Sequence, residues 1–349
     1  MSVFLVVLAG IIMFGLLIAV HEFGHFIVAK WCGVKVNEFS IGMGPKLLSR
    51  QGRETLYSLR LFPIGGFCAM EGEDEDTGDP RSFQQASAWK KFLILVAGAF
   101  MNFLVGFLIF LCLCAARPNY YVDVISGFTP DSALPAQGLQ VGDEFLSIDG
   151  HAILVNGDAK LFLSRAEGRA DIKVLRNGQA IVLKDVDLIR DANNTLGVSI
   201  GVRAYPASPW DNLRLSWCHS IDTVRLVWIS LGDLLTGSVG IRDMSGPVGI
   251  VDMMGQVAGQ AESTAQGFWS IVYFMAFIAI NLAVMNLLPI PALDGGRIFF
   301  LIVNLIYTAL TKRRLDPKYE GAVNTVFFMA LLGLMVVVAA SDVLKLFGR

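Results

Sequence analysis

Four long apolar segments restrict this chain to the folds that a lipid bilayer allows. Each has close to the roughly 20 residues that a helix needs to cross the hydrocarbon core of a membrane. They are residues 3–28, 92–116, 269–290 and 322–340. A fifth apolar run, residues 298–310, is shorter and predicts a buried or interfacial helix. We therefore expect a polytopic α-helical membrane protein with four transmembrane helices.

The composition agrees with a membrane protein and argues against other classes. Of the 349 residues, 54% are hydrophobic and 17% are charged, whereas soluble domains carry about 25% charged residues. A net charge of −2 argues against a nucleic-acid partner. The five cysteines have no regular spacing and predict no disulfide framework. The first apolar run lacks a basic start and a cleavage site, so we expect a retained helix and not a signal peptide.

Basic residues predict which side of the membrane each loop occupies. Lys and Arg are frequent in residues 29–91. They recur just before the last apolar run, at Lys312, Arg313, Arg314 and Lys318. By the positive-inside rule we expect both regions in the cytoplasm, with residues 117–268 and both termini outside. The opposite orientation stays open, because long loops are exported largely regardless of their charge.

The exported stretch changes character near residue 206. Before it, short β-like runs alternate with turn signals such as Asp149-Gly150, which predicts a small β-rich domain. After it, Trp, Leu and Val are interleaved with Asp and Arg, which predicts an amphipathic helical connector. This connector lies either on the membrane surface or against the small domain. The chain is thereby divided into residues 1–116, 117–205, 206–268 and 269–349.

An HExxH motif, with His21, Glu22 and His25, follows directly on the first apolar run. Residues four apart share one face of a helix, so both imidazoles can bind one metal ion. Glu22 is then placed to act as the general base on a metal-bound water. Ionisable side chains are costly within a membrane and usually mark function there. The alternative is a pair of polar residues at a helix end without such a role.

A catalytic zinc site needs a third protein ligand and one open position. The two other histidines lie in the exported stretch, so Asp294 is the best remaining candidate. Pro289 and Pro291 end the preceding apolar helix, and Gly295-Gly296 permits a sharp turn that aims the carboxylate inward. Asp294 has an alternative role as the cap of the helix that follows it.

These motifs resemble those of the bacterial site-2 proteases, the RseP/RasP type of intramembrane zinc metalloprotease. HEFGH matches the zinc motif of that family, and NLLPIPALDGG matches its second signature. The resemblance runs almost end to end. It implies one zinc ion per chain, held by His21, His25 and Asp294, with Glu22 as catalytic base. It also implies that substrate is held by three residues of the second signature, Asn286, Pro289 and Pro291.

Other segments carry the same resemblance. Residues 55–67 resemble the membrane-associated β-loop, and residues 245–250 resemble the segment before the third helix. The AGAFMN sequence resembles the second-helix motif and implies a substrate role for Asn102, although Ala99 replaces the usual proline. Residues 130–150 resemble a bacterial PDZ domain, and only one such segment occurs, as in the single-PDZ members of the family.

A transmembrane substrate must unwind before hydrolysis, because a helix hides its backbone carbonyls in its own hydrogen bonds. A sheet edge near the metal can hold the unwound segment as an added strand. Residues 55–67 are our candidate for that edge, with Leu59 and Phe62 as contacts, unless they form an ordinary core strand. Asn286 is expected to bond a substrate amide from the other side.

The resemblance implies a bacterial inner-membrane protein that cleaves single-span membrane proteins, such as anti-sigma factors or remnant signal peptides, after an upstream site-1 protease. The PDZ domain then acts either as a size filter or as a receptor for a newly exposed C-terminus. Two other functions are a zinc or proton transporter and a non-catalytic membrane adaptor. The ionisable residues gather at one side of the membrane, which disfavours transport, and an intact Glu22 disfavours an adaptor.

Overall fold

The computed structural model describes residues 3–73, 77–190, 195–240, 246–259, 263–312 and 317–347. The chain divides into two compact units, Met1–Ile109 with Thr223–Arg349, and Phe110–Asp222. Each unit is described by itself. Of the residues named above, 245, 313 and 314 lie outside the described part of the chain.

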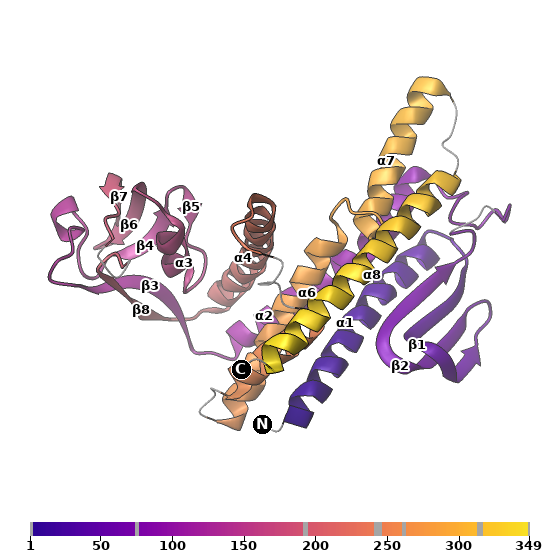
Figure 1. Ribbon diagram of the computed structural model, residues 1–349, viewed down its shortest axis with the longest axis horizontal. Coiled ribbons are helices and arrows are strands. Elements are labelled where there is room, and N and C mark those ends of the chain that lie inside the picture. The colour runs from indigo at the N-terminus through magenta and orange to yellow at the C-terminus, as the bar shows by residue number, and fades with distance from the viewer. Residues whose placement is uncertain are drawn as a thin grey trace. The chain divides into compact units, whose positions relative to one another are not determined.

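Within the described residues, four helices are long and apolar enough to cross a membrane, which confirms the predicted number of spans. They are α1 (Val3–Trp31), α2 (Ala88–Ala115), α6 (Thr264–Asn286) and α8 (Pro317–Phe347). In Figure 1, α1, α6 and α8 of the first unit run along roughly the same line. Apolar side chains of α1 and α6 share one buried cluster, which includes Leu17, Ile278 and Ala279.

Further helices connect these segments along the chain. The predicted connector contains α4 (Pro209–Thr236) and α5 (Pro247–Gly259). Met254 of α5 is buried in the cluster shared by α1 and α6, so α5 packs into the bundle and takes neither of the two placements that the sequence left open. The fifth apolar run is a helix as predicted, α7 (Asp294–Thr311).

A bent antiparallel sheet lies beside α1 and is formed by β1 (Val36–Gln51) and β2 (Leu56–Met70) (Figure 1). Both strands bend on themselves, so four extended segments pair in the order 46–51, 56–60, 36–41 and 66–70. Residues 66–70 are therefore one edge of this sheet. The expectation that residues 55–67 offer the open edge needs correction, because Leu59 pairs with Ile41 on one side and Leu48 on the other.

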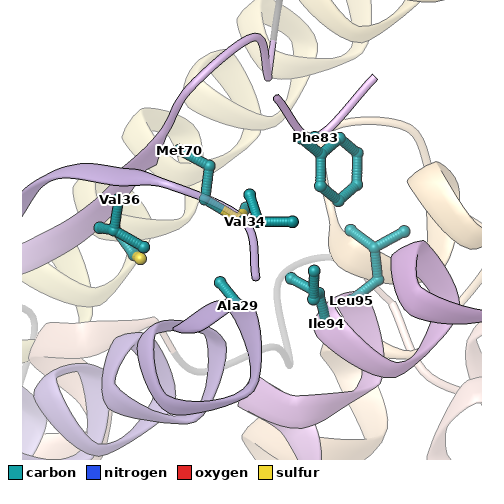
Figure 2. Close-up of a cluster of buried hydrophobic side chains, with 8 residues drawn as sticks. Ala29, Val34, Val36, Met70, Phe83, Ile94 and Leu95 are labelled. Atoms are coloured by element: carbon teal, nitrogen blue, oxygen red, sulfur yellow. The ribbon is translucent and has the colours of Figure 1, made fainter. Parts of the chain in front are cut away.

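One apolar cluster joins the end of α1, the sheet and the start of α2. Figure 2 shows side chains from these elements and from the loops between them converging: Ala29, Val34, Val36, Met70, Phe83, Ile94 and Leu95. Each is at most 7% exposed. Burial of apolar surface stabilises by roughly 25 cal/mol per Å², so this cluster holds the three elements in place. It matters for function because Ile94, Leu95 and Met70 adjoin the HExxH residues.

The second unit contains a six-stranded antiparallel sheet in the order β7-β6-β4-β3-β8, with β5 paired to β4. The strands are β3 (Asn119–Phe128), β4 (Glu144–Ile148), β5 (His151–Ala152), β6 (Arg169–Arg176), β7 (Gln179–Asp187) and β8 (Val198–Pro206). Helix α3 (Asp158–Arg165) packs on β4. Asp149 and Asn177 adopt positive φ angles at the predicted turns. The strand β8 was not expected, and the assignment of residues 117–205 to a PDZ domain stays a prediction.

Candidate metal centre

His21 and His25 lie one turn apart on α1 and face the same side of the helix. Their rings meet edge to face with centroids 4.8 Å apart, and their Nε2 atoms are 3.2 Å apart. His25 is buried. The helical repeat thus brings two metal-ligating nitrogens together.

Asp294, the first residue of α7, carries the third candidate ligand atom. Its Oδ2 atom lies 3.1 Å from Nε2 of His21 and 3.4 Å from Nε2 of His25. Burial raises the pKa of this carboxyl group, but the two imidazoles lower it by more and hold it below its usual range. Among the described residues the carboxylate accepts no backbone hydrogen bond from α7. The alternative role as a helix cap therefore does not apply.

Two glycines let the chain fold back so that Asp294 reaches the histidines. A Cβ atom at Gly295 would lie 2.2 Å from the carbonyl oxygen of Leu288. One at Gly296 would lie 2.3 Å from the carbonyl oxygen of Ile290. Such approaches are closer than any side chain permits, so both positions require glycine.

The loop before Asp294 is also held by a contact that the sequence did not reveal. Ala292 has a positive φ of 75°, and such a conformation costs a non-glycine residue of order 1–3 kcal/mol. The N–H of Ala292 donates a hydrogen bond of 3.1 Å to Oδ1 of Asn324 on α8. Asn324 therefore fixes the loop from a different helix, although in the sequence it is one polar residue in an apolar run.

The three candidate ligand atoms fit a tetrahedral zinc site. Zinc binds nitrogen and oxygen at about 2.0–2.2 Å, which places tetrahedral ligand atoms about 3.3 Å apart. The observed separations are 3.1, 3.2 and 3.4 Å. Oδ2 of Asp294 is also buried without a hydrogen-bond partner in the described residues, and an unpaired buried acceptor costs about 1–3 kcal/mol. A cation removes that cost, and three protein ligands leave the fourth position open for water.

Each imidazole has a further contact through Nδ1. Nδ1 of His25 donates to the carbonyl oxygen of Ile94 on α2, at 2.8 Å. Nδ1 of His21 lies 3.4 Å from the side-chain amide of Asn286, the last residue of α6. Contacts of this kind fix the tautomer and the ring orientation of a metal ligand. The sequence could not indicate Ile94, because every residue has a backbone carbonyl.

Glu22 opens onto the same cavity as the three candidate ligands. The cavity has a volume of about 360 Å³. The edge segment of β2 forms one wall through Phe67, Cys68, Ala69 and Met70. Glu22 is not a member of the cluster of candidate ligands.

An ion pair between Glu73 and Arg297 lines this cavity and connects two of its walls. Arg297 lies on α7 one turn after Asp294. Glu73 also accepts a hydrogen bond of 3.3 Å from the N–H of Met70, at the end of the edge segment. The pair thereby ties the sheet edge to the helix that carries Asp294. Neither residue stands out in the sequence, because Glu73 is one acid among several in a charged loop.

The other predicted substrate residues are not gathered at this cavity. Leu59 and Phe62 are 43% and 56% exposed, but they do not line it. Asn102 is 1% exposed inside α2, so a substrate has no access to it. Pro289 lines a separate, largely apolar cavity of about 360 Å³. Pro291 packs against Gly296: a Cβ atom added at Gly296 would lie 2.8 Å from the Cα atom of Pro291.

Comparison with known proteins gives a consistent result. The sequence matches the profile of Peptidase family M50 over residues 9–334. A Clostridium perfringens protein, named as a candidate zinc metalloprotease, is 36% identical over 341 residues, which cover 97% of this chain and 98% of that protein. The zinc metalloprotease RasP of Shouchella clausii is 30% identical over 427 residues, with 98% and 99% coverage. RasP of Geobacillus kaustophilus is 26% identical, with 98% coverage of both chains.

Proposed function

Because this chain belongs to Peptidase family M50 and is an intramembrane zinc metalloprotease, we propose that His21, His25 and Asp294 hold its zinc ion and that Glu22 is its catalytic base. One observation carries the ligand assignment. The three ligand atoms lie 3.1–3.4 Å apart around a buried carboxylate oxygen that has no other partner in the described residues.

The chemistry follows from this arrangement. Zinc, when bound, supplies a Lewis acid that lowers the pKa of water and polarises the scissile carbonyl. Glu22 takes the proton of the attacking water and passes it to the leaving amine as the C–N bond breaks. The Ile94 carbonyl holds the His25 ring in the orientation that presents Nε2 to the site.

The edge segment 66–70 is the best candidate to receive an unwound substrate. It pairs with β1 on one side, and its residues line the cavity that contains Glu22. Addition of a strand there supplies backbone partners for a substrate whose helical hydrogen bonds have been broken. This proposal replaces the one for Leu59, whose backbone is already paired on both sides. Phe62 is 56% exposed and remains a candidate for side-chain contact with substrate.

The natural substrates are proposed to be single-span membrane proteins, with anti-sigma factors and remnant signal peptides as the classes that the family suggests. An upstream site-1 protease is then the proposed partner in the same pathway. The proposed location is a bacterial inner membrane, with residues 29–91 in the cytoplasm and both termini outside. Residues 117–205 are proposed as an external PDZ domain, acting as a size filter or as a C-terminus receptor.

The proteolytic proposal is tested by co-expression with a panel of tagged single-span membrane proteins. The wild-type chain is compared with Glu22→Gln, which keeps the size of the side chain but cannot accept a proton. We expect at least one protein to be cut within its transmembrane segment by the wild type alone. General-base catalysis contributes roughly 10²–10⁴-fold, so the variant should be nearly inactive. Equal cleavage by both forms would refute the role of Glu22.

The ligand assignment has its own test. Zinc is measured in purified wild type, His21→Ala, Asp294→Asn and Glu22→Gln after dialysis against a weak chelator. We expect loss of zinc in the first two variants and retention in the third, because only Glu22 is not a ligand. Unchanged zinc in both His21→Ala and Asp294→Asn would overturn the assignment.

A further inference from the structure

The two histidines of the candidate metal centre differ in the group that contacts their Nδ1 atom. His25 Nδ1 donates to a backbone carbonyl, that of Ile94, at 2.8 Å. His21 Nδ1 instead lies 3.4 Å from the side-chain amide of Asn286, whose nitrogen Nδ2 is the atom placed toward it. No other hydrogen-bond partner for His21 Nδ1 occurs among the described residues.

The position of Nε2 determines what His21 Nδ1 must do. Nε2 of His21 faces Oδ2 of Asp294 and Nε2 of His25, so it is the atom that a metal ion at this site engages. A neutral imidazole that binds metal through Nε2 carries its proton on Nδ1. Nδ1 is then a donor and needs an acceptor, because the side chain of His21 is only 11% exposed and an unpaired buried donor costs about 1–3 kcal/mol.

The side chain of Asn286 can provide that acceptor. A half-turn of its amide group exchanges the oxygen and the nitrogen at the same place, and the hydrogen-bond network decides which of them faces His21. With a proton on Nδ1, the oxygen must face it, since two donors repel each other. The amide NH₂ group then points away from the imidazole and is free to donate elsewhere.

We infer that Asn286 is a positioning residue for the zinc ligand His21: its side-chain oxygen accepts the Nδ1 proton and fixes the tautomer and ring orientation in which Nε2 faces the metal. This rests on the proposed ligand set. The family resemblance implies only that Asn286 holds substrate. Support of the zinc ligand His21 is a second role for the same side chain. The two imidazoles thus have equivalent support, one from the backbone of α2 and one from a side chain of α6.

The packing around the two imidazole rings is consistent with an acceptor for His21 that comes from α6. A Cβ atom at Gly98 would lie 2.8 Å from His21 Nδ1 and 2.4 Å from His25 Nε2, so the backbone of α2 passes directly against both rings. The α2 carbonyl that serves His25 is that of Ile94, one turn before Gly98. His21 lies one turn earlier on α1 than His25, and its acceptor comes from the end of α6.

The inference is tested by zinc affinity, measured by competition with a chromophoric chelator on purified protein in detergent. Three variants are compared with the wild type: Asn286→Leu, Asn286→Asp and, as a matched control, Asn304→Leu on α7. Loss of an outer partner of a metal ligand typically weakens binding by about 10–100-fold. We expect that loss in Asn286→Leu, near-wild-type affinity in Asn286→Asp, because a carboxylate also accepts the proton, and no change in the control.

A spectroscopic measurement separates positioning from general damage to the fold. Each variant is loaded with Co²⁺ in place of zinc, and its visible absorption reports ligand geometry at the metal. We expect a changed spectrum for Asn286→Leu and a near-wild-type spectrum for Asn286→Asp. If Asn286→Leu keeps wild-type zinc affinity and spectrum while cleavage is lost, Asn286 serves substrate alone and the inference is wrong. Equal loss in Asn286→Asp and Asn286→Leu would also overturn it.

Failure of the ligand set would look different. If His21→Ala keeps wild-type zinc affinity, then His21 is not a ligand and the proposed function of the site fails first. If His21→Ala loses zinc while Asn286→Leu does not, the ligand set stands and only the positioning role is refuted.

Discussion

Gly98 lies so close to His25 that a methyl group at Gly98 would be 2.4 Å from the Nε2 atom of His25. That atom is a proposed zinc ligand, so the absence of a side chain on α2 is part of the metal centre. The same methyl group would lie 2.7 Å from Cε1 of His21. The sequence does not indicate that Gly98 lies against the two histidines, because glycine is common in membrane helices.

The first prediction concerns this contact. Gly98→Ala should displace both imidazoles and weaken zinc binding by about tenfold or more, by analogy with lost ligand orientation. The matched control is Gly333→Ala on α8, where an added Cβ meets nothing within 4 Å. Zinc content after dialysis and helical circular dichroism are measured for both. Wild-type zinc content in Gly98→Ala would mean that the rings can shift without loss of the metal.

A second prediction concerns Asp342, a buried acid of α8. Its Oδ2 atom accepts hydrogen bonds of 2.8 Å from the N–H groups of Gly246 and Gly249, at the start of α5. Asp342→Ala removes a charged cap and should lower the free energy of unfolding by about 2 kcal/mol. Asp342→Asn should lose less, because its amide oxygen still accepts. Thermal unfolding in detergent gives the order, and equal midpoints for all three proteins would contradict the capping role.

A third prediction concerns the ion pair of Glu73 and Arg297 at the metal cavity. Both side chains are less than one third exposed. Neutralising either one should therefore lower the free energy of unfolding of the protein, because its partner then loses this ion pair. A double-mutant cycle with Glu73→Gln and Arg297→Gln should give a coupling energy of about 1 kcal/mol. Thermal midpoints of the four proteins measure it. Strict additivity of the two substitutions would show that the pair does not hold the sheet edge to α7.

The proximity of His21 and His25 was predictable because its signals are local. HExxH places His21, Glu22 and His25 by the helical repeat alone, and the glycines after Asp294 indicate a turn. The four spans were predictable because hydropathy and length suffice for them. The third ligand needed a topological argument, since Asp294 lies far from the histidines in sequence.

What could not be predicted depends on pairings between distant segments. The two halves of β2 lie on opposite sides of residues 36–41, and this placement decides which half forms the edge of the sheet. The partly alternating sequence of β2 is compatible with either half at the edge. The same limit applies to α5, which belongs to a connector expected on the membrane surface or against the small domain, yet Met254 is buried in the cluster shared by α1 and α6. Backbone acceptors such as the Ile94 carbonyl leave no trace in a sequence.

A fourth prediction tests the proposed orientation in the membrane. Single cysteines are introduced at the exposed positions Arg53 and Glu167 in a chain whose own five cysteines are replaced. An impermeant thiol reagent added to intact cells should label position 167 and not position 53, because the basic loop 29–91 is expected in the cytoplasm. Labelling after membrane disruption is the control. The reverse pattern would place residues 29–91 outside the cell and residues 117–268 in the cytoplasm.

The last prediction concerns His219 of α4, whose ring stacks on Phe110 within the second unit with centroids 5.2 Å apart. Burial and, to a smaller extent, the nearby Arg117 lower the pKa of His219 to about 4, while Asp158 opposes the shift. The unfolded chain, with a histidine pKa of about 6.5, therefore binds more protons than the folded chain between these two values. The stability contribution of a neutral His219 is present above pH 6.5 and is lost as the pH falls toward 4.

Between pH 7 and pH 5 this difference should lower the free energy of unfolding by about 2 kcal/mol. His219→Gln cannot titrate, so its thermal midpoint should fall less over the same interval than that of the wild type. The comparison between the two proteins removes the contribution of all other groups, because those are common to both. Parallel pH profiles for wild type and variant would show that His219 is not held neutral by its surroundings.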